Sequence, residues 1–122
     1  MNITTNVRQV GEVAILDITG NIVFGEESAA LHDVVAGLLK TGQKQILLNL
    51  GGVNYIDSMG MGSLVGASTS VRKQGGELKL LNLSNKVADL MQMTRLYTYF
   101  DVMSDEVAGV KSFGQSASAA KS

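Results

Sequence analysis

The sequence contains no cysteine and only one histidine, His32, among its 122 residues. The absence of cysteine excludes disulfides, thiolate nucleophiles and zinc–thiolate sites. A single histidine excludes a metal site built from several histidines, and a Ser-His-Asp triad would have to recruit His32. We therefore expect no metal and no other cofactor, and we expect His32 to lie on the surface.

Charge is sparse as well. Ten basic and eleven acidic residues give a net charge of −1, and the charged fraction of 17% lies below the usual value of roughly 25%. The lysines and arginines are scattered along the chain, so they predict no basic stripe of the kind that binds a phosphate backbone. We expect no direct nucleic-acid partner, and a lightly charged surface fits a protein that docks onto other proteins.

Long apolar runs are also missing. No run approaches the roughly 18 residues of a membrane span, and residues 1–10 lack the apolar core of a signal peptide. We therefore expect no membrane insertion and a cytoplasmic location. The length suits a single domain, which we place at residues 1–113. The small and polar residues of segment 114–122 predict a disordered tail.

The hydrophobic pattern that is present predicts strands alternating with helices. The predicted strands cover residues 3–10, 12–19, 45–50, 77–83 and 99–103, and the predicted helices cover residues 26–40, 58–73, 84–93 and a last segment from residue 104. We expect Gly20 to end the second strand and residues 51–56 to form a loop. This order predicts an α/β fold whose sheet is mainly parallel in its centre and carries an antiparallel hairpin.

A run rich in glycine and methionine opens the second predicted helix and forms the candidate site. The run is Asp57, Ser58, Met59, Gly60, Met61 and Gly62. Each glycine at such a place costs about 1 kcal/mol relative to alanine, and we expect both methionines to be partly exposed. Exposed methionines and bare glycines suit an adaptable docking surface. The plainer interpretation, that Ser58 only caps the helix, also fits these residues.

Nucleotide binding at this run is disfavoured by its glycine spacing. A dinucleotide fingerprint needs glycines at relative positions 1, 3 and 6, but position 6 counted from Gly60 is Val65, and Gly66 comes one residue late. The predicted loop 51–56 is also too long for a tight Rossmann turn. The Gly-Lys-Ser/Thr of a phosphate-binding loop is absent.

Serine hydrolase chemistry is disfavoured too. Neither Ser58 nor Ser63 lies in the Gly-x-Ser-x-Gly frame of a nucleophile elbow. His32 belongs to a different predicted helix, so it is a poor candidate for the base of a triad. We therefore expect that the protein is not an enzyme.

Four features follow one another along the chain: a strand at 46–50, the Asp-Ser-x-Gly-x-Gly motif at 57–62, the segment GGELKL at 75–80 and Phe-Asp-Val at 100–102. They carry a resemblance to a STAS domain of the bacterial anti-sigma-factor antagonist type. It covers roughly residues 3–113. It implies a STAS-type fold, with a central mixed sheet of four to five strands, an N-terminal antiparallel hairpin and about four helices packed mainly on one face.

The resemblance also implies a partner-switching function controlled by phosphorylation. An unphosphorylated antagonist binds an anti-sigma factor that is also a serine kinase and so releases a sigma factor. The kinase inactivates the antagonist by phosphorylating the serine at the Ser58 position, and a serine phosphatase restores it. Ser58 would thus be the phosphorylation site, and residues 57–62 would contact the partner. We expect a monomer or a weak homodimer.

Two features of the chain depart from the family pattern. Met59 replaces the serine or threonine that often follows the phosphorylation site, and the segment Asn21–Gly25 lacks the acid that many members use at the anti-sigma interface. Ile22, Val23 and Phe24 would supply an apolar contact to the partner instead. A different role stays open, as a scaffold of a stressosome-like assembly or an accessory subunit of a lipid-transport system.

Overall fold

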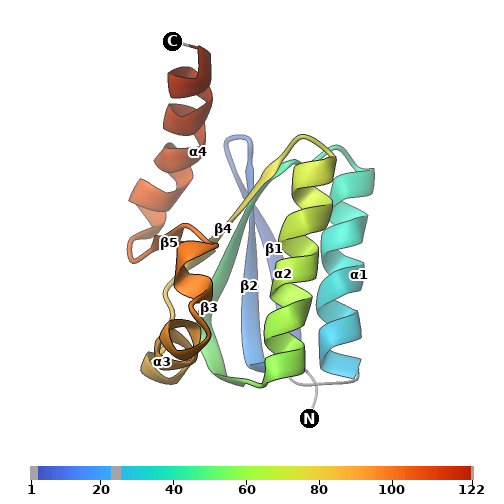
Figure 1. Ribbon diagram of the computed structural model, residues 1–122. Coiled ribbons are helices and arrows are strands. Elements are labelled where there is room, and N and C mark those ends of the chain that lie inside the picture. Colours follow the sequence, from blue (N-terminus) through green and yellow to red (C-terminus); the bar gives the residue numbers. More distant parts are fainter. Residues whose placement is uncertain (1–2, 23–25, 122) are drawn as a thin grey trace.

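The computed structural model of the protein describes residues 3–22 and 26–121 (Figure 1). The strands are β1 (Thr4–Val10), β2 (Val13–Ile22), β3 (Gln45–Ile56), β4 (Glu77–Leu81) and β5 (Val102–Met103). The helices are α1 (Glu26–Lys40), α2 (Ser58–Lys73), α3 (Asn85–Thr94), a 3-10 turn η1 (Leu96–Thr98) and α4 (Glu106–Lys121). The predicted order of strands and helices is confirmed.

The strands form one sheet in the order β1-β2-β3-β4-β5. β1 and β2 are antiparallel and all other neighbours are parallel. Because successive right-handed crossovers add each new strand on the same side, their helices cover the same face of the sheet. Figure 1 shows α1 and α2 side by side on this face, and α3 contributes to the same core cluster. The expected mixed sheet with an N-terminal hairpin is confirmed.

The first half of strand β2 is buried on both faces, in keeping with its nearly continuous apolar run. Leu16 and Ile18 point into the large core beneath α1, α2 and α3. Val13 and Ile15 point to the opposite face, where they pack against Phe113 of α4. The alternation follows from the two-residue period of a strand. Helix α4 therefore covers part of the face of the sheet that the other three helices leave open.

Two strands extend beyond their predicted ends. Gly20 does not end β2, which continues to Ile22 through a register shift near Gly20. Residues 51–56, predicted to be a loop, are instead the second half of β3, where Ile56 pairs with Ile22. Glycine weakens a strand, so the glycines near these positions led to predicted strand ends that were too early. Pairing between two distant segments supplies the backbone hydrogen bonds that keep both strands extended.

Helix α4 is anchored by one aromatic side chain and one buried cation. Phe113 is fully buried, and Lys79 Nζ lies 4.9 Å from the centre of its ring and 3.0 Å from Ser112 Oγ. Phe113 is the last residue of α4 whose side chain is described, so the division between a domain at 1–113 and a tail stays a prediction. Within residues 3–22 and 26–121, no helix is long and apolar enough to cross a membrane.

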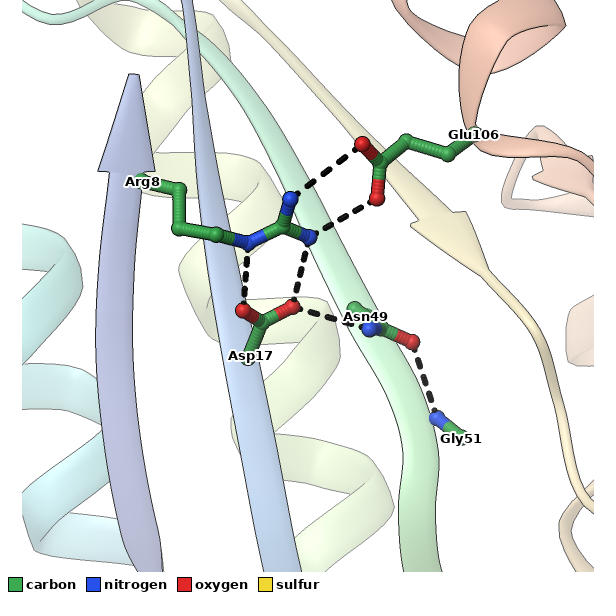
Figure 2. A network of polar contacts seen from close by, with 5 residues as sticks. All are labelled: Arg8, Asp17, Asn49, Gly51 and Glu106. Carbon is green, nitrogen blue, oxygen red and sulfur yellow. Dashed lines mark hydrogen bonds and ion pairs between the residues drawn. The ribbon is translucent and has the colours of Figure 1, made fainter. Parts of the chain in front are cut away.

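A polar network ties the start of α4 to the first three strands (Figure 2). The Arg8 guanidinium donates to the Asp17 carboxylate through Nε at 2.6 Å and to the Glu106 carboxylate at 2.8 Å. Asn49 donates a further hydrogen bond to Asp17 at 2.8 Å and accepts one from the Gly51 amide. Nothing in the sequence alone predicted this network, because its members come from β1, β2, β3 and α4.

This network makes stability sensitive to acid. The hydrogen bonds from Arg8 and then from Asn49 lower the pKa of Asp17 from its ordinary value of 3.8. The native state then binds fewer protons than the unfolded chain at this site, so the stabilisation is complete above the ordinary pKa and is lost as pH falls through the lowered one. The measurement is the urea midpoint between about pH 6 and pH 3. Asp17→Asn should flatten the acid limb of this curve. Parallel acid limbs for the two proteins would contradict the assignment.

Candidate functional site at the start of helix α2

The candidate site lies where β3 passes directly into α2. Asp57 alone joins the two elements, so the argument that a long loop separates them was wrong. Asp57 adopts an extended backbone and caps the helix: its Oδ1 accepts a hydrogen bond from the Gly60 amide at 2.7 Å. Its carbonyl accepts from the Met61 amide at 2.8 Å. The glycine spacing still differs from that of a dinucleotide fingerprint.

Ser58 is the first residue of α2 and is exposed. The interpretation of Ser58 as the helix cap is wrong, because Asp57 holds that position. None of the hydrogen bonds seen among the described residues uses the Ser58 hydroxyl. Its oxygen is therefore accessible from solvent at the positive end of a helix.

The two glycines of the motif serve different purposes. Gly60 is buried, and a Cβ added to it would overlap the backbone carbonyl of Ile22. The same carbonyl accepts a hydrogen bond from the Asp57 amide at 3.2 Å. Gly62 is exposed, and an added Cβ would meet nothing within 4 Å. Gly60 is thus required by the close packing of α2 on the end of β2, whereas Gly62 leaves open space above the helix.

The two methionines also differ. Met59 is 56% exposed, whereas Met61 is 2% exposed and packs in the core with Leu64. The expectation that both would be partly exposed was therefore wrong for Met61. Residues two positions apart in the sequence are about 200° apart around a helix, so one methionine faces solvent while the other faces the sheet.

The remaining predicted site residues lie elsewhere. Val23 and Phe24 are outside the described residues, and Ile22, expected to be exposed beside them, is fully buried. His32 is exposed on α1, as predicted. Two large apolar side chains are exposed near the end of β3. The sequence did not indicate them, because outward-facing positions carry no distinguishing signal. These are Tyr55 and Met93, which border a shallow groove of about 230 Å³ that Lys86, Asp89 and Leu90 complete.

A family model and a sequence relative each match most of this chain. The model of the STAS domain matches residues 4–109. The anti-sigma-B factor antagonist of Bacillus subtilis (strain 168) is 34% identical over 112 residues, which are 91% of this chain and 100% of that protein. This chain belongs to the STAS domain family.

Solved structures share the architecture of this STAS domain. A candidate anti-sigma factor antagonist from Thermotoga maritima superposes with a TM-score of 0.82 at 23% identity, over 89% of this chain and 93% of that one. The Bacillus cell fate determinant SpoIIAA in its phosphorylated form superposes with a TM-score of 0.68 at 17% identity, over 88% and 97% of the two chains. At these identities the superpositions establish the common fold, which confirms the STAS-type fold that the motif implied.

The start of α2 in this STAS domain offers an exposed hydroxyl group and two backbone amides to a ligand or a modifying group. The Ser58 hydroxyl is exposed, and the amides of Ser58 and Met59 have no acceptor within the helix, as for the first residues of any α-helix. Such a place suits an anionic group such as a phosphate. His32, the only histidine, lies on α1, and the Asp57 carboxylate is engaged with the Gly60 amide. An anionic group attached at Ser58 would therefore lie close to these two amides.

Proposed function

We propose that this STAS domain is an anti-sigma factor antagonist that phosphorylation of Ser58 switches off. The observation that carries the proposal is the exposed Ser58 hydroxyl, which Asp57 leaves unused by taking the capping position itself. The name of the Bacillus subtilis relative, an anti-sigma-B factor antagonist, supports the same function. In its unphosphorylated state the chain would bind an anti-sigma factor that is a serine kinase, and so release a sigma factor.

A phosphate on Ser58 is compatible with the folded domain. Phosphoserine adds about −1.5 to −2 charges at neutral pH. At a helix N-terminus an anion gains about 0.3–1 kcal/mol from the helix dipole and the free amides. The Asp57 carboxylate next to it offsets part of this gain. The net effect on the free energy of unfolding is small, so phosphorylation should leave the fold intact.

The same phosphate is not compatible with a buried interface. Leaving an unpaired charge in such an interface costs about 3–5 kcal/mol, which corresponds to roughly a hundredfold or more in affinity. This cost is several times larger than the gain from the helix dipole. The switch therefore acts on partner binding rather than on folding.

The proposal includes the other expected partners. A serine phosphatase acting on phosphorylated Ser58 would restore the antagonist. The chain would act without catalytic residues, cofactor or direct contact with nucleic acid, as a monomer or a weak homodimer. The predicted cytoplasmic location and a contact surface formed by Asp57, Ser58, Met59 and Gly62, with Val23 and Phe24, belong to the same proposal. Gly60 and Met61, which were also predicted to contact the partner, are buried and support this surface from below.

The proposal is tested by mapping phosphate on the protein isolated from its own bacterium. Mass spectrometry of its peptides should find phosphate on Ser58. Ser63, in the next turn of α2, is the matched control, because this residue is less exposed than Ser58 and its hydroxyl donates to the Met59 carbonyl at 3.4 Å. The kinase that transfers phosphate from ATP to Ser58 is then purified, and its binding to the unphosphorylated chain is measured. Absence of phosphate from Ser58, or a stable large assembly that phosphate does not affect, would contradict the proposal.

A further inference from the structure

We propose that Met59 is an oxidation site whose sulfoxide blocks docking at the start of α2. This would give the Ser58 switch a second input from oxidants, and it rests on the function proposed above. Met59 directly follows Ser58 in α2, and this apolar residue is 56% exposed.

The methionines of the chain differ sharply in their access to a dissolved oxidant. Met59 and Met93 are 56% and 81% exposed, whereas Met61 and Met91 are buried in the core. Oxidation of methionine follows the exposure of its sulfur. Met59 and Met93 should therefore react first, and the two buried methionines serve as internal references for slow reaction.

The reaction needs only a two-electron oxidant of the peroxide class. The thioether sulfur attacks one oxygen of hydrogen peroxide, an S–O bond forms and the O–O bond breaks. The released hydroxide takes the proton of the transferred oxygen, which yields the sulfoxide and one molecule of water. Sulfur loses two electrons and the peroxide gains them. Methionine sulfoxide reductases reverse the change, as a regulatory modification requires.

The consequence depends on whether the side chain is free or docked. In the free domain the sulfoxide of Met59 remains in water, so the fold should not be affected. In the proposed complex the same group would be covered by the partner. A polar S=O group buried without a donor costs about 1–3 kcal/mol, so the affinity should fall at least about fivefold. A flexible thioether, by contrast, fits an apolar contact well.

The experiment treats the full chain with hydrogen peroxide and measures its binding to the purified kinase that phosphorylates Ser58. Met59→Leu removes the proposed oxidation site, and Met93→Leu is the matched control at a second methionine that is exposed among residues 3–22 and 26–121. Each variant is compared with its own untreated sample, so a change in basal affinity cancels. We expect treated wild type and Met93→Leu to lose affinity at least about fivefold, treated Met59→Leu to be unaffected, and sulfoxide reductases to restore the wild type.

Peptide mapping of the treated protein is the second measurement and needs no partner. The proposal is overturned if Met59 oxidises no faster than Met61, if treated wild type binds as tightly as untreated protein, or if Met59→Leu loses affinity in the same proportion. Ser58→Glu is measured alongside. If it binds as tightly as the wild type, the proposed docking surface itself fails; if it binds weakly while oxidation has no effect, only the role of Met59 fails.

Discussion

Ser58→Glu is expected to lower the affinity for the serine kinase roughly a hundredfold or more, because the carboxylate would be buried without a counterion. The free energy of unfolding should change by no more than about 0.5 kcal/mol, as for most exposed positions. The two quantities are measured by calorimetric titration with the kinase and by urea denaturation. Loss of binding without loss of stability is the signature of a switch at the interface.

Ser70→Glu is the matched control for this substitution. Ser70 is on the same helix and is partly exposed, and it lies about 18 Å along the helix axis from Ser58. The Ser70→Glu substitution adds the same charge to the domain, so the comparison separates a local effect at the interface from an effect of net charge. Equal losses of affinity in both variants, or wild-type affinity in Ser58→Glu, would exclude Ser58 from the docking surface.

Gly60→Ala is expected to destabilise the domain by about 3 kcal/mol or more, the upper part of the usual range for overpacking. The added methyl group would overlap the Ile22 carbonyl, which is backbone and cannot rotate away. The start of α2 would have to move off β2, which would also disturb the hydrogen bond from the Asp57 amide to the same carbonyl. Urea denaturation measures the effect.

Gly62→Ala provides the comparison within the same motif. An added Cβ has open space at this position, and alanine is a better helix former than glycine by about 1 kcal/mol. The variant should therefore be as stable as the wild type or up to about 1 kcal/mol more stable. If the partner approaches the helix over Gly62, the same variant should bind the kinase more weakly. Equal effects of the two substitutions on stability would refute the distinction between the glycines.

The fold could be predicted from the sequence to the level of its elements. The hydrophobic pattern predicted both β2 and α1, because the period of apolar residues records which sides of a single element meet the core. The predicted helix at 84–93 is confirmed as α3, with Ser84 as its cap, where the Ser84 hydroxyl accepts from the Val87 amide. The ends of β2 and β3 were missed, since glycine-rich segments stay extended here only through pairing with each other.

The candidate site was predicted in position but not in detail. The motif at 57–62 was located from its composition and its resemblance to the STAS family. Which residue caps the helix could not be read from the order of Asp57 and Ser58, because both types are good caps. The direct passage from β3 into α2 places Asp57 at the cap and Ser58 in the first turn. Because Asp57 is the cap, the Ser58 hydroxyl is left accessible.

The sequence by itself determined the order of strands and helices, the core of the sheet and the place of the Ser58 motif. These follow from periodicity and from local residue types, which act over a few neighbouring positions. Only the tertiary structure decided that Gly60 is required by packing, that Met61 is buried while Met59 is free, and that Arg8 joins Asp17 to Glu106. These depend on atoms distant in the chain, such as the Ile22 carbonyl, whose positions follow only from the packed fold.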